Sequence, residues 1–153
     1  MKIQYHNRTR LPAAVENQLG VRYCSSLEEL LRNSDVVSLH CPLNKSTRGL
    51  ISAKEFAIMK DGVFIINTAR GPIIDEEALI AALESGKVRR AGLDVFEDEP
   101  KISSYFAQSD KCTIQPHLGG GTRKANRNGE REAFENIKAF IKTGKPIASI
   151  NKL

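Results

Sequence analysis

Long hydrophobic runs are missing from this sequence of 153 residues. No apolar stretch approaches the roughly 20 residues that a membrane-spanning helix needs. The start, Met1–Tyr5, also lacks the charged and apolar regions of a secretory signal. We therefore expect a soluble cytoplasmic protein with no membrane partner.

Cysteine is scarce, with only Cys24, Cys41 and Cys112 along the chain, and no two of them form a Cys-x-x-Cys pair. An odd number of dispersed cysteines is typical of reduced thiols in the cytosol. Neither these residues nor the three histidines show zinc-ligand spacing. We expect no metal site.

The net charge of +5 is the one compositional feature that could indicate nucleic-acid binding. The basic residues are dispersed, however, apart from Arg89, Arg90 and the stretch 123–131. Such groups are usually solvated faces of helices or loops. We expect no nucleic-acid partner.

Short apolar runs alternate with helical patterns along the whole chain. The pattern predicts strands at 2–5, 21–23, 35–40, 63–67, 88–95 and 113–115, and helices at 12–19, about 25–32, 52–59, 75–85 and about 122–142. We expect strand 35–40 to be buried and strand 63–67 to be buried on both faces, as in a parallel sheet.

Local signals mark several of the predicted helix ends. Either Ser25 or Ser26 can open a capping box for the second helix, and Ser52 opens one for the third. Asp75 is an N-cap candidate, and Gly86 follows the same helix where a terminating glycine belongs. Strands and helices in alternation predict a doubly wound α/β sheet, which binds ligands at the carboxyl ends of its strands.

Three polar side chains follow strands of this predicted sheet. Arg70, Glu99 and His117 belong to the segments 67–71, 92–100 and 116–119. Together they can bind a carboxylate, orient an imidazole and transfer a proton. Taken singly, each has a plain alternative: a surface ion pair, a solvated loop acid or a loop histidine.

At these segments the chain resembles the D-isomer-specific 2-hydroxyacid dehydrogenase family, and within it the glyoxylate and hydroxypyruvate reductases. The matching motifs are 30–52, 59–75, 92–96 with Glu99 and Pro100, and 116–119. They cover nearly the whole chain. The resemblance implies a Rossmann-type sheet and an NAD(P)-dependent reduction of small 2-oxo acids to D-2-hydroxy acids.

The resemblance also implies site roles. Arg70 would hold the substrate's carboxylate and carbonyl, His117 would protonate the carbonyl, and Glu99 would orient His117 and raise its pKa. Asp94 would accept from the nicotinamide carboxamide. The expected cofactor-binding set is Asn7, Arg8, Arg10, Cys41, Pro42, Thr68, Ala69, Arg70, Asp94, His117 and Gly119.

The segment after the first strand bears on the choice of cofactor. NAD-preferring folds place an acid near this point for the ribose hydroxyls. Here the next acid is Glu16, inside a predicted helix, whereas Arg8 and Arg10 offer charge for a 2′-phosphate. We expect NADP(H) to be preferred, with NAD(H) possible.

The glycine-rich phosphate loop of such folds lies about 20 residues before this segment. We therefore expect a partial Rossmann-type sheet that lacks its first strand and this loop. Residues 1–121 would form the incomplete NAD(P)-binding domain, and 122–153 a helix and tail returning to a substrate domain. We expect a homodimer in the complete form and little or no activity from this chain alone.

Two rivals to the enzyme stay open at this point. One is a non-catalytic dinucleotide-binding module, like the transcriptional corepressors that resemble the family. The other is a structural remnant of the enzyme. The set Arg70, Glu99 and His117 favours enzymatic ancestry but does not separate an enzyme from a remnant.

Overall fold

The computed structural model describes residues 1–149, so the last four residues of the predicted tail lie outside the described part. The chain divides into two compact units. The first is Met1–His117, and the second begins at Leu118.

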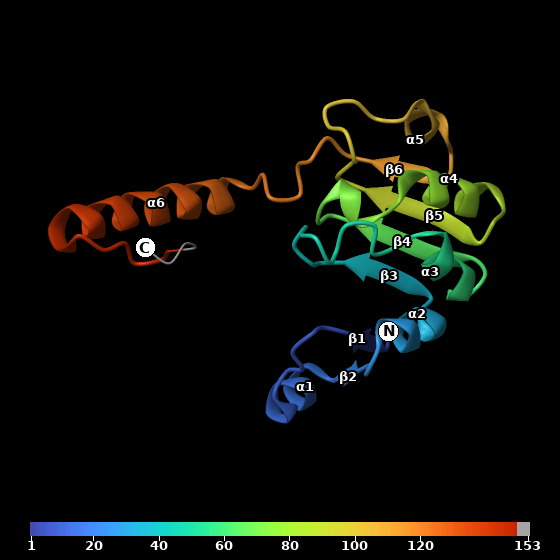
Figure 1. Ribbon diagram of the computed structural model, residues 1–153, viewed down its shortest axis with the longest axis horizontal. Coiled ribbons are helices and arrows are strands. Elements are labelled where there is room, and N and C mark those ends of the chain that lie inside the picture. Colours follow the sequence, from blue (N-terminus) through green and yellow to red (C-terminus); the bar gives the residue numbers. More distant parts are fainter. Residues whose placement is uncertain (150–153) are drawn as a thin grey trace. The chain divides into compact units, whose positions relative to one another are not determined.

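Strands and helices alternate through the first unit (Figure 1). In order, they are β1 (Ile3–Tyr5), α1 (Ala13–Leu19), β2 (Val21–Tyr23), α2 (Leu27–Asn33), β3 (Val36–Leu39), α3 (Ala53–Ile58), β4 (Val63–Asn67), the 3-10 helix η1 (Gly71–Ile73), α4 (Glu76–Glu84), β5 (Val88–Leu93), α5 (Ser104–Gln108) and β6 (Cys112–Ile114). The predicted α/β class is confirmed.

The described strands pair only in parallel, and they form two sheets. One has the order β3-β4-β5-β6, and the other contains β1 and β2. Within residues 1–149, β1 therefore pairs only with β2, and β3 only with β4. We call residues 3–23, which hold β1, α1 and β2, the β1–β2 lobe.

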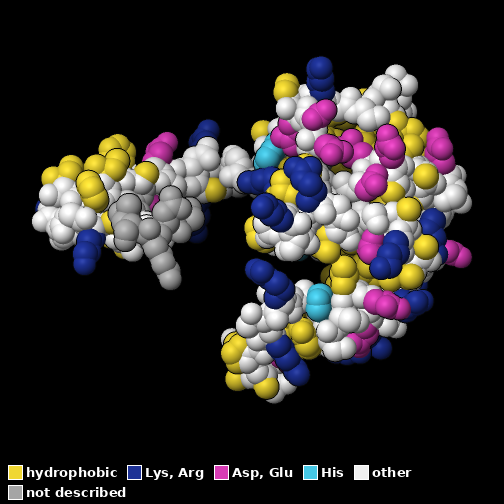
Figure 2. Space-filling view, viewed as in Figure 1, with side chains coloured by type: hydrophobic (Ala, Val, Ile, Leu, Met, Phe, Trp, Pro, Cys, Tyr) yellow, Lys and Arg dark blue, Asp and Glu magenta, His cyan; other side chains and the backbone are white. Residues whose placement is uncertain are grey.

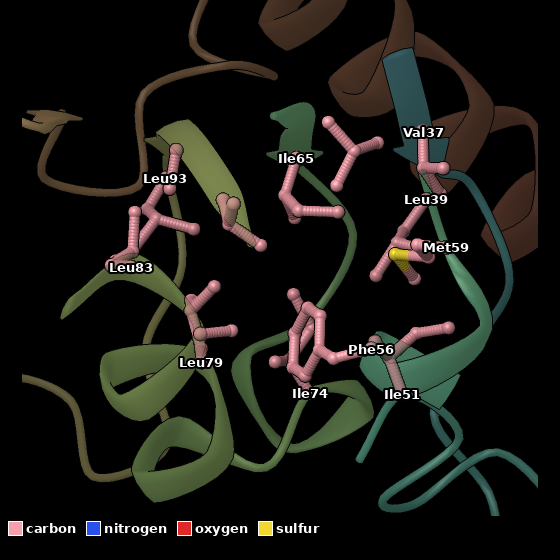
Figure 3. Packing of buried hydrophobic residues seen from close by; sticks show 14 of the residues in the cluster. Val37, Leu39, Ile51, Phe56, Met59, Ile65, Ile74, Leu79, Leu83 and Leu93 are labelled. Carbon is pink, nitrogen blue, oxygen red and sulfur yellow. The ribbon is translucent and has the colours of Figure 1, made fainter. Parts of the chain in front are cut away.

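The core lies on one face of the larger sheet. Val37 and Leu39 of β3 and Ile65 of β4 point toward Phe56 of α3 and Leu79 of α4 (Figure 3). Burying one apolar side chain of this size stabilises the folded state by about 1.5–3 kcal/mol. This packing fixes the strands whose carboxyl ends carry the polar residues.

We expected strand 35–40 to be buried and strand 63–67 to be buried on both faces. This is wrong for one face of the sheet, where the side chains are partly exposed. Val36 is 51% exposed, and Phe64 and Ile66 are only half-buried. The reason is that the buried side chains of α2, α3 and α4 join a single cluster with the alternate residues, such as Val37 and Ile65. Among the described residues, the opposite face lacks equal cover.

Most predicted helix ends are confirmed by hydrogen bonds. Ser26, rather than Ser25, caps α2 by accepting from the amide of Glu29 at 3.0 Å. Ser52 forms the predicted capping box, and Asp75 accepts from an amide of α4 at 3.0 Å. Gly86 has a φ of 80°, as expected for a residue that ends a helix. Sequence patterns did not predict α5 or η1.

The second unit is dominated by α6 (Arg123–Thr143), which Thr122 caps at one end and Gly144 ends at the other. Its apolar side chains are exposed, at 70% for Phe134, 57% for Ile137 and 77% for Ile141. Figure 2 shows hydrophobic side chains gathered on the visible surface of this helix. Across residues 1–149, no helix combines the length and apolar character needed to cross a membrane.

Candidate active site

The carboxyl ends of β4, β5 and β6 carry the predicted catalytic segments. β4 ends at Asn67 and leads into the turn with Arg70, β5 leads into Asp94, and β6 is followed shortly by His117. Because these strands are neighbours in one parallel sheet, their carboxyl ends lie along the same edge. The fold thus brings these segments to the same end of the sheet.

The turn after β4 is organised by Asn67, whose side chain is 1% exposed. Its amide nitrogen donates to the carbonyl of Arg70 at 3.0 Å, and its oxygen accepts from the amide of Ala69 at 3.0 Å. Its backbone carbonyl accepts from the amide of Asp94 at 3.0 Å. Asn67 therefore fixes the turn that presents Arg70, a role that the sequence interpretation missed. A polar residue closing an apolar strand was the available signal.

Gly71 joins this turn to the loop after β5. A β-carbon at this position would overlap the backbone carbonyl of Phe96 and crowd the amide of Glu97 at 2.5 Å. Only a residue without a side chain permits this approach. The turn that carries Arg70 therefore packs directly against the loop that leads from Phe96 to Glu99.

Glu99 and His117 form a hydrogen-bonded pair. Oε2 of Glu99 lies 2.8 Å from Nδ1 of His117, and Oε1 accepts from the amide of Phe96 at 2.9 Å. Since an ionised carboxylate only accepts, Nδ1 carries the hydrogen, and Nε2 is the ring nitrogen that can meet a substrate. The predicted contact between these side chains is confirmed.

The surroundings favour the charged form of Glu99. The hydrogen bond from His117, followed by the bond from Phe96, holds the pKa of Glu99 below its usual value, and the positive charge of Arg70 adds to this effect. His117 itself has a φ of 56°, an uncommon left-handed conformation for a residue other than glycine. Such conformations are concentrated at functional sites.

A cleft of about 510 Å³ adjoins the pair. Its polar part is formed by Glu99, Gln115 and His117, and its apolar lining includes Phe96, Ile102 and Ile114. This volume lies in the range of about 300–1,000 Å³ that is usual for small-molecule sites. Arg70 is not among the residues that line it, so the convergence of all three side chains on one cleft stays a prediction.

The predicted cofactor-binding residues are distributed over several places. Asn7, Arg8, Cys41 and Pro42 line a second, larger cleft between the β1–β2 lobe and β3. Thr68 and Ala69 lie in the turn after β4, Asp94 is 5% exposed after β5, and Gly119 belongs to the second unit. Burial raises the pKa of the Cys41 thiol, which favours its neutral form.

Arg10 is held differently from Arg8. Its guanidinium forms two hydrogen bonds with Glu16, at 2.9 and 2.7 Å, and lies 5.1 Å from the ring centre of Tyr23. Tyr5 also donates to Glu16, at 2.6 Å. The bonds from Arg10 and then Tyr5 lower the pKa of Glu16 to about 2. Glu16 thus engages two of the three guanidinium nitrogens of Arg10, whose side chain is 59% exposed, and its contact with a cofactor stays a prediction.

The side chain of Arg8 is available for such a contact. Its backbone amide bonds to Asn7 at 3.0 Å, and no hydrogen bond or ion pair of its guanidinium occurs within the described residues. Because it lines the larger cleft, Arg8 is the cation that this loop presents. Residues 1–149 contain no cluster of three potential metal ligands.

A parallel α/β sheet with an acid–histidine pair and an arginine-bearing turn at one edge is the arrangement expected of a nucleotide-binding domain of an oxidoreductase. Residues 1–119 match the D-isomer specific 2-hydroxyacid dehydrogenase, NAD binding domain. The chain belongs to this family, and the family expected from the sequence motifs is confirmed.

Individual relatives agree with this placement. Dehydrogenase efuE of Hormonema carpetanum is 55% identical over 151 residues, which cover 99% of this chain and 38% of that protein. The crystal structure of a glyoxylate reductase from Paecilomyes thermophila has a TM-score of 0.91 at 45% identity, covering 98% of this chain and 45% of the other.

A second similar structure carries a bound cofactor. It is the NADPH-dependent glyoxylate/hydroxypyruvate reductase of Sinorhizobium meliloti in complex with NADP and malonate, with a TM-score of 0.87 at 28% identity. The match covers 96% of this chain and 44% of that one. In each of these comparisons, the chain spans less than half the length of its relative.

Proposed function

We propose that this chain is the catalytic part of an NAD(P)-dependent enzyme that reduces small 2-oxo acids, such as glyoxylate or hydroxypyruvate, to D-2-hydroxy acids. The observation that carries the proposal is the 2.8 Å contact between Glu99 and His117 at the sheet edge that also bears Arg70. Relatives named glyoxylate reductase and glyoxylate/hydroxypyruvate reductase support the substrate class.

Each of the three residues has one task in this reaction. Arg70 offers a planar fork of N–H donors that suits a carboxylate and the adjoining carbonyl oxygen. His117, charged and oriented by Glu99, delivers a proton from Nε2 to the carbonyl oxygen. A bound nicotinamide supplies the hydride. Asp94, at the end of β5, is proposed to orient the carboxamide of that ring.

The cofactor-binding residues fit a dinucleotide that spans two regions of the site. Arg70, Asp94 and His117 follow the strands β4 to β6, and Asn7, Arg8, Cys41 and Pro42 line the larger cleft. Arg8 is proposed to bind the 2′-phosphate of NADP(H), which makes this the preferred cofactor over NAD(H). The NADPH-dependent relative supports this preference.

The second unit is proposed to serve assembly. Residues 122–153 would return to a substrate domain, and the complete protein would be a homodimer. The exposed apolar stripe of α6, which includes Phe134, Ile137 and Ile141, supports such a covered position. All three cysteines are free, which supports a cytoplasmic location.

A chimera tests the proposed activity. Residues 1–149 would replace the matched segment of the Paecilomyes thermophila glyoxylate reductase, and NADPH oxidation would be followed with glyoxylate and with hydroxypyruvate. We expect turnover near 1 per second or above, within the usual enzyme range. The matched control is the same chimera with His117→Ala. A folded chimera without turnover on either acid would refute the proposed function.

The unmodified chain of 153 residues gives the complementary measurement. We propose that it is nearly inactive alone, because hydride transfer needs a site closed against water and a positioned cofactor. Turnover of the isolated chain equal to that of the chimera would show that this part is wrong.

A further inference from the structure

The loop that carries Glu99 is tied to α4 through a backbone amide. The amide of Glu97 donates to Oε1 of Glu76 at 2.8 Å, and Glu76 lies in the first turn of α4. The two residues are 21 positions apart in the sequence, so this bond joins two distant segments. By contrast, the bond from the amide of Phe96 to Glu99 closes the loop on itself. The contact with Glu76 therefore links the loop to another element of the first unit.

Helix α4 gives this contact a fixed support. Leu79 and Leu83 of the helix are buried and belong to the core (Figure 3). Asp75, directly before Glu76, caps the start of the helix by accepting from an amide of its first turn. A functional site keeps its geometry when the residues around it are themselves held by packing and hydrogen bonds. Glu76 meets this condition.

The backbone at Glu97 is also restricted from a second side. A β-carbon at Gly71 would lie 2.5 Å from the amide nitrogen of Glu97 and would overlap the carbonyl of Phe96. Glu99 follows two residues later. One of its oxygens lies 2.8 Å from Nδ1 of His117, and the other accepts from the amide of Phe96. A shift of the loop would therefore move the carboxylate that orients His117.

An acceptor oxygen, rather than negative charge, distinguishes Glu76. Burial raises the pKa of Glu76, the hydrogen bond from the amide of Glu97 opposes this effect, and the negative charges of Glu97 and Asp98 raise it further. The next residue, Glu77, is exposed and brings the same charge to the same helical turn. Charge alone would thus be supplied at less cost by Glu77.

An ion pair between Arg48 and Glu97 is a weaker candidate for the same task. The charged atoms lie 3.8 Å apart, and the side chains are 62% and 50% exposed. Exposed pairs of this kind contribute little, because water and salt screen the charges. The bond between the amide of Glu97 and Glu76 is the better-shielded link.

We propose that Glu76 is a positioning residue for the reaction: it holds the amide of Glu97, and the loop fixed in this way holds Glu99 against His117. Its catalytic meaning rests on the proposed function, but the contact can be tested in the chain alone. In this role Glu76 acts through the loop and not on substrate or cofactor. Its loss should disturb the alignment of the proton donor more than the binding of either ligand.

The first test uses the chain of 153 residues and carboxyl carbon NMR. In the unmodified chain, the bonds from His117 and then Phe96 hold the pKa of Glu99 below its usual value. Glu76→Ala should loosen the loop and weaken both bonds, so the titration midpoint of Glu99 should rise toward its usual value. The amide resonance of Glu97 should move as well, since this amide loses its acceptor.

Further variants separate the acceptor from the charge and from the helix. Glu76→Gln keeps an acceptor oxygen without the charge, so the midpoint of Glu99 should stay close to that of the unmodified chain. Glu77→Ala removes the same charge from the same turn and should also leave this midpoint unchanged. A general loss of helix stability would affect Glu76→Ala and Glu77→Ala alike, and urea denaturation measures it. Glu76→Met, which keeps the length of the side chain and lacks the carboxyl acceptor, replaces Glu76→Ala if the latter does not fold.

Turnover of the chimera gives a second readout. Glu76→Ala should lower kcat by roughly 10- to 100-fold, because a small misplacement of a catalytic group is costly. The KM values for the 2-oxo acid and for NADPH should change little, since no contact with either is lost. Glu76→Gln should restore most of the turnover.

Two results would overturn the proposal. One is a midpoint of Glu99 that is the same in the unmodified chain and in a folded variant without the acceptor. The other is an equal rise of this midpoint in Glu76→Gln or Glu77→Ala, which would show an effect of charge or of the helix. Neither result depends on turnover. A chimera without activity would refute the proposed function, and the titration of Glu99 would still decide whether Glu76 positions it.

Discussion

Glu99 accepts two hydrogen bonds at once, from Nδ1 of His117 at 2.8 Å and from the amide of Phe96 at 2.9 Å. The loop after β5 therefore fixes the carboxylate of Glu99 through the amide of Phe96, and the fixed carboxylate orients the imidazole of His117, which follows β6. Two neighbouring strand ends are coupled through one side chain.

Replacing His117 tests this arrangement. In the chimera, His117→Ala should reduce kcat by roughly 10²–10⁴-fold, because it removes the proton donor. The dissociation constant of NADPH should change little, since no phosphate contact is lost. Single-turnover kinetics and cofactor fluorescence measure the two quantities. Equal losses in kcat and in NADPH affinity would mean that His117 contributes to cofactor binding and is not specifically the proton donor.

Arg8 and Arg10 should differ in their effect on cofactor choice. Arg8→Gln should raise the KM for NADPH by roughly 10- to 100-fold and leave that for NADH almost unchanged, because a charged hydrogen bond of about 1.5–3 kcal/mol acts on one phosphate. Arg10→Gln should weaken both cofactors alike, since it releases Glu16 and loosens the loop. The same selectivity from both variants would contradict this division of roles.

The pH response of Glu16 is a third prediction. Its pKa of about 2 lies below the usual value of about 4.3. Its ionised form therefore stabilises the fold fully above that usual value, and the contribution is lost as the pH falls toward 2. Carboxyl carbon NMR should show a midpoint near 2, and a higher one in Arg10→Gln. A midpoint near 4.3 in both proteins would disprove the contact.

Alanine substitutions at two glycines should change the free energy of unfolding in opposite directions. Gly71→Ala should destabilise the first unit by at least about 1–3 kcal/mol, since the new methyl group overlaps the backbone of Phe96. Gly129→Ala should stabilise α6 by about 1 kcal/mol, because nothing lies within 4 Å of the added carbon. Urea denaturation measures both. An unaffected Gly71→Ala variant would show that the close approach is absent in solution.

Local signals predicted the elements well where they act within a few residues. The capping box of Ser52 and the cap of Asp75 are short-range hydrogen bonds, so the sequence shows them directly. The five residues of α5 are too few for a helical period to be visible.

Contacts that depend on how the elements pack were less accessible to the sequence. The ion pair of Arg10 with Glu16 depends on how α1 folds back on the loop, and no spacing rule predicts it. The motifs that brought Glu99 and His117 together could be recognised only through the family resemblance. The exposure of Val36 depends on which neighbours its strand has, which is a property of the sheet and not of the strand.

The β1–β2 lobe has a consequence for cofactor affinity. Each of its strands has three residues, and a two-stranded sheet of this length is marginal in water. Local opening of this lobe should therefore need less free energy than opening of β3 to β6. Because Arg8 belongs to the lobe, the residue proposed to select the cofactor lies on a part of the first unit that we expect to open easily. If Arg8 binds the 2′-phosphate as proposed, part of the binding free energy is spent on the conformational entropy that the lobe loses. A substitution that rigidifies the free lobe should then tighten cofactor binding without adding a contact.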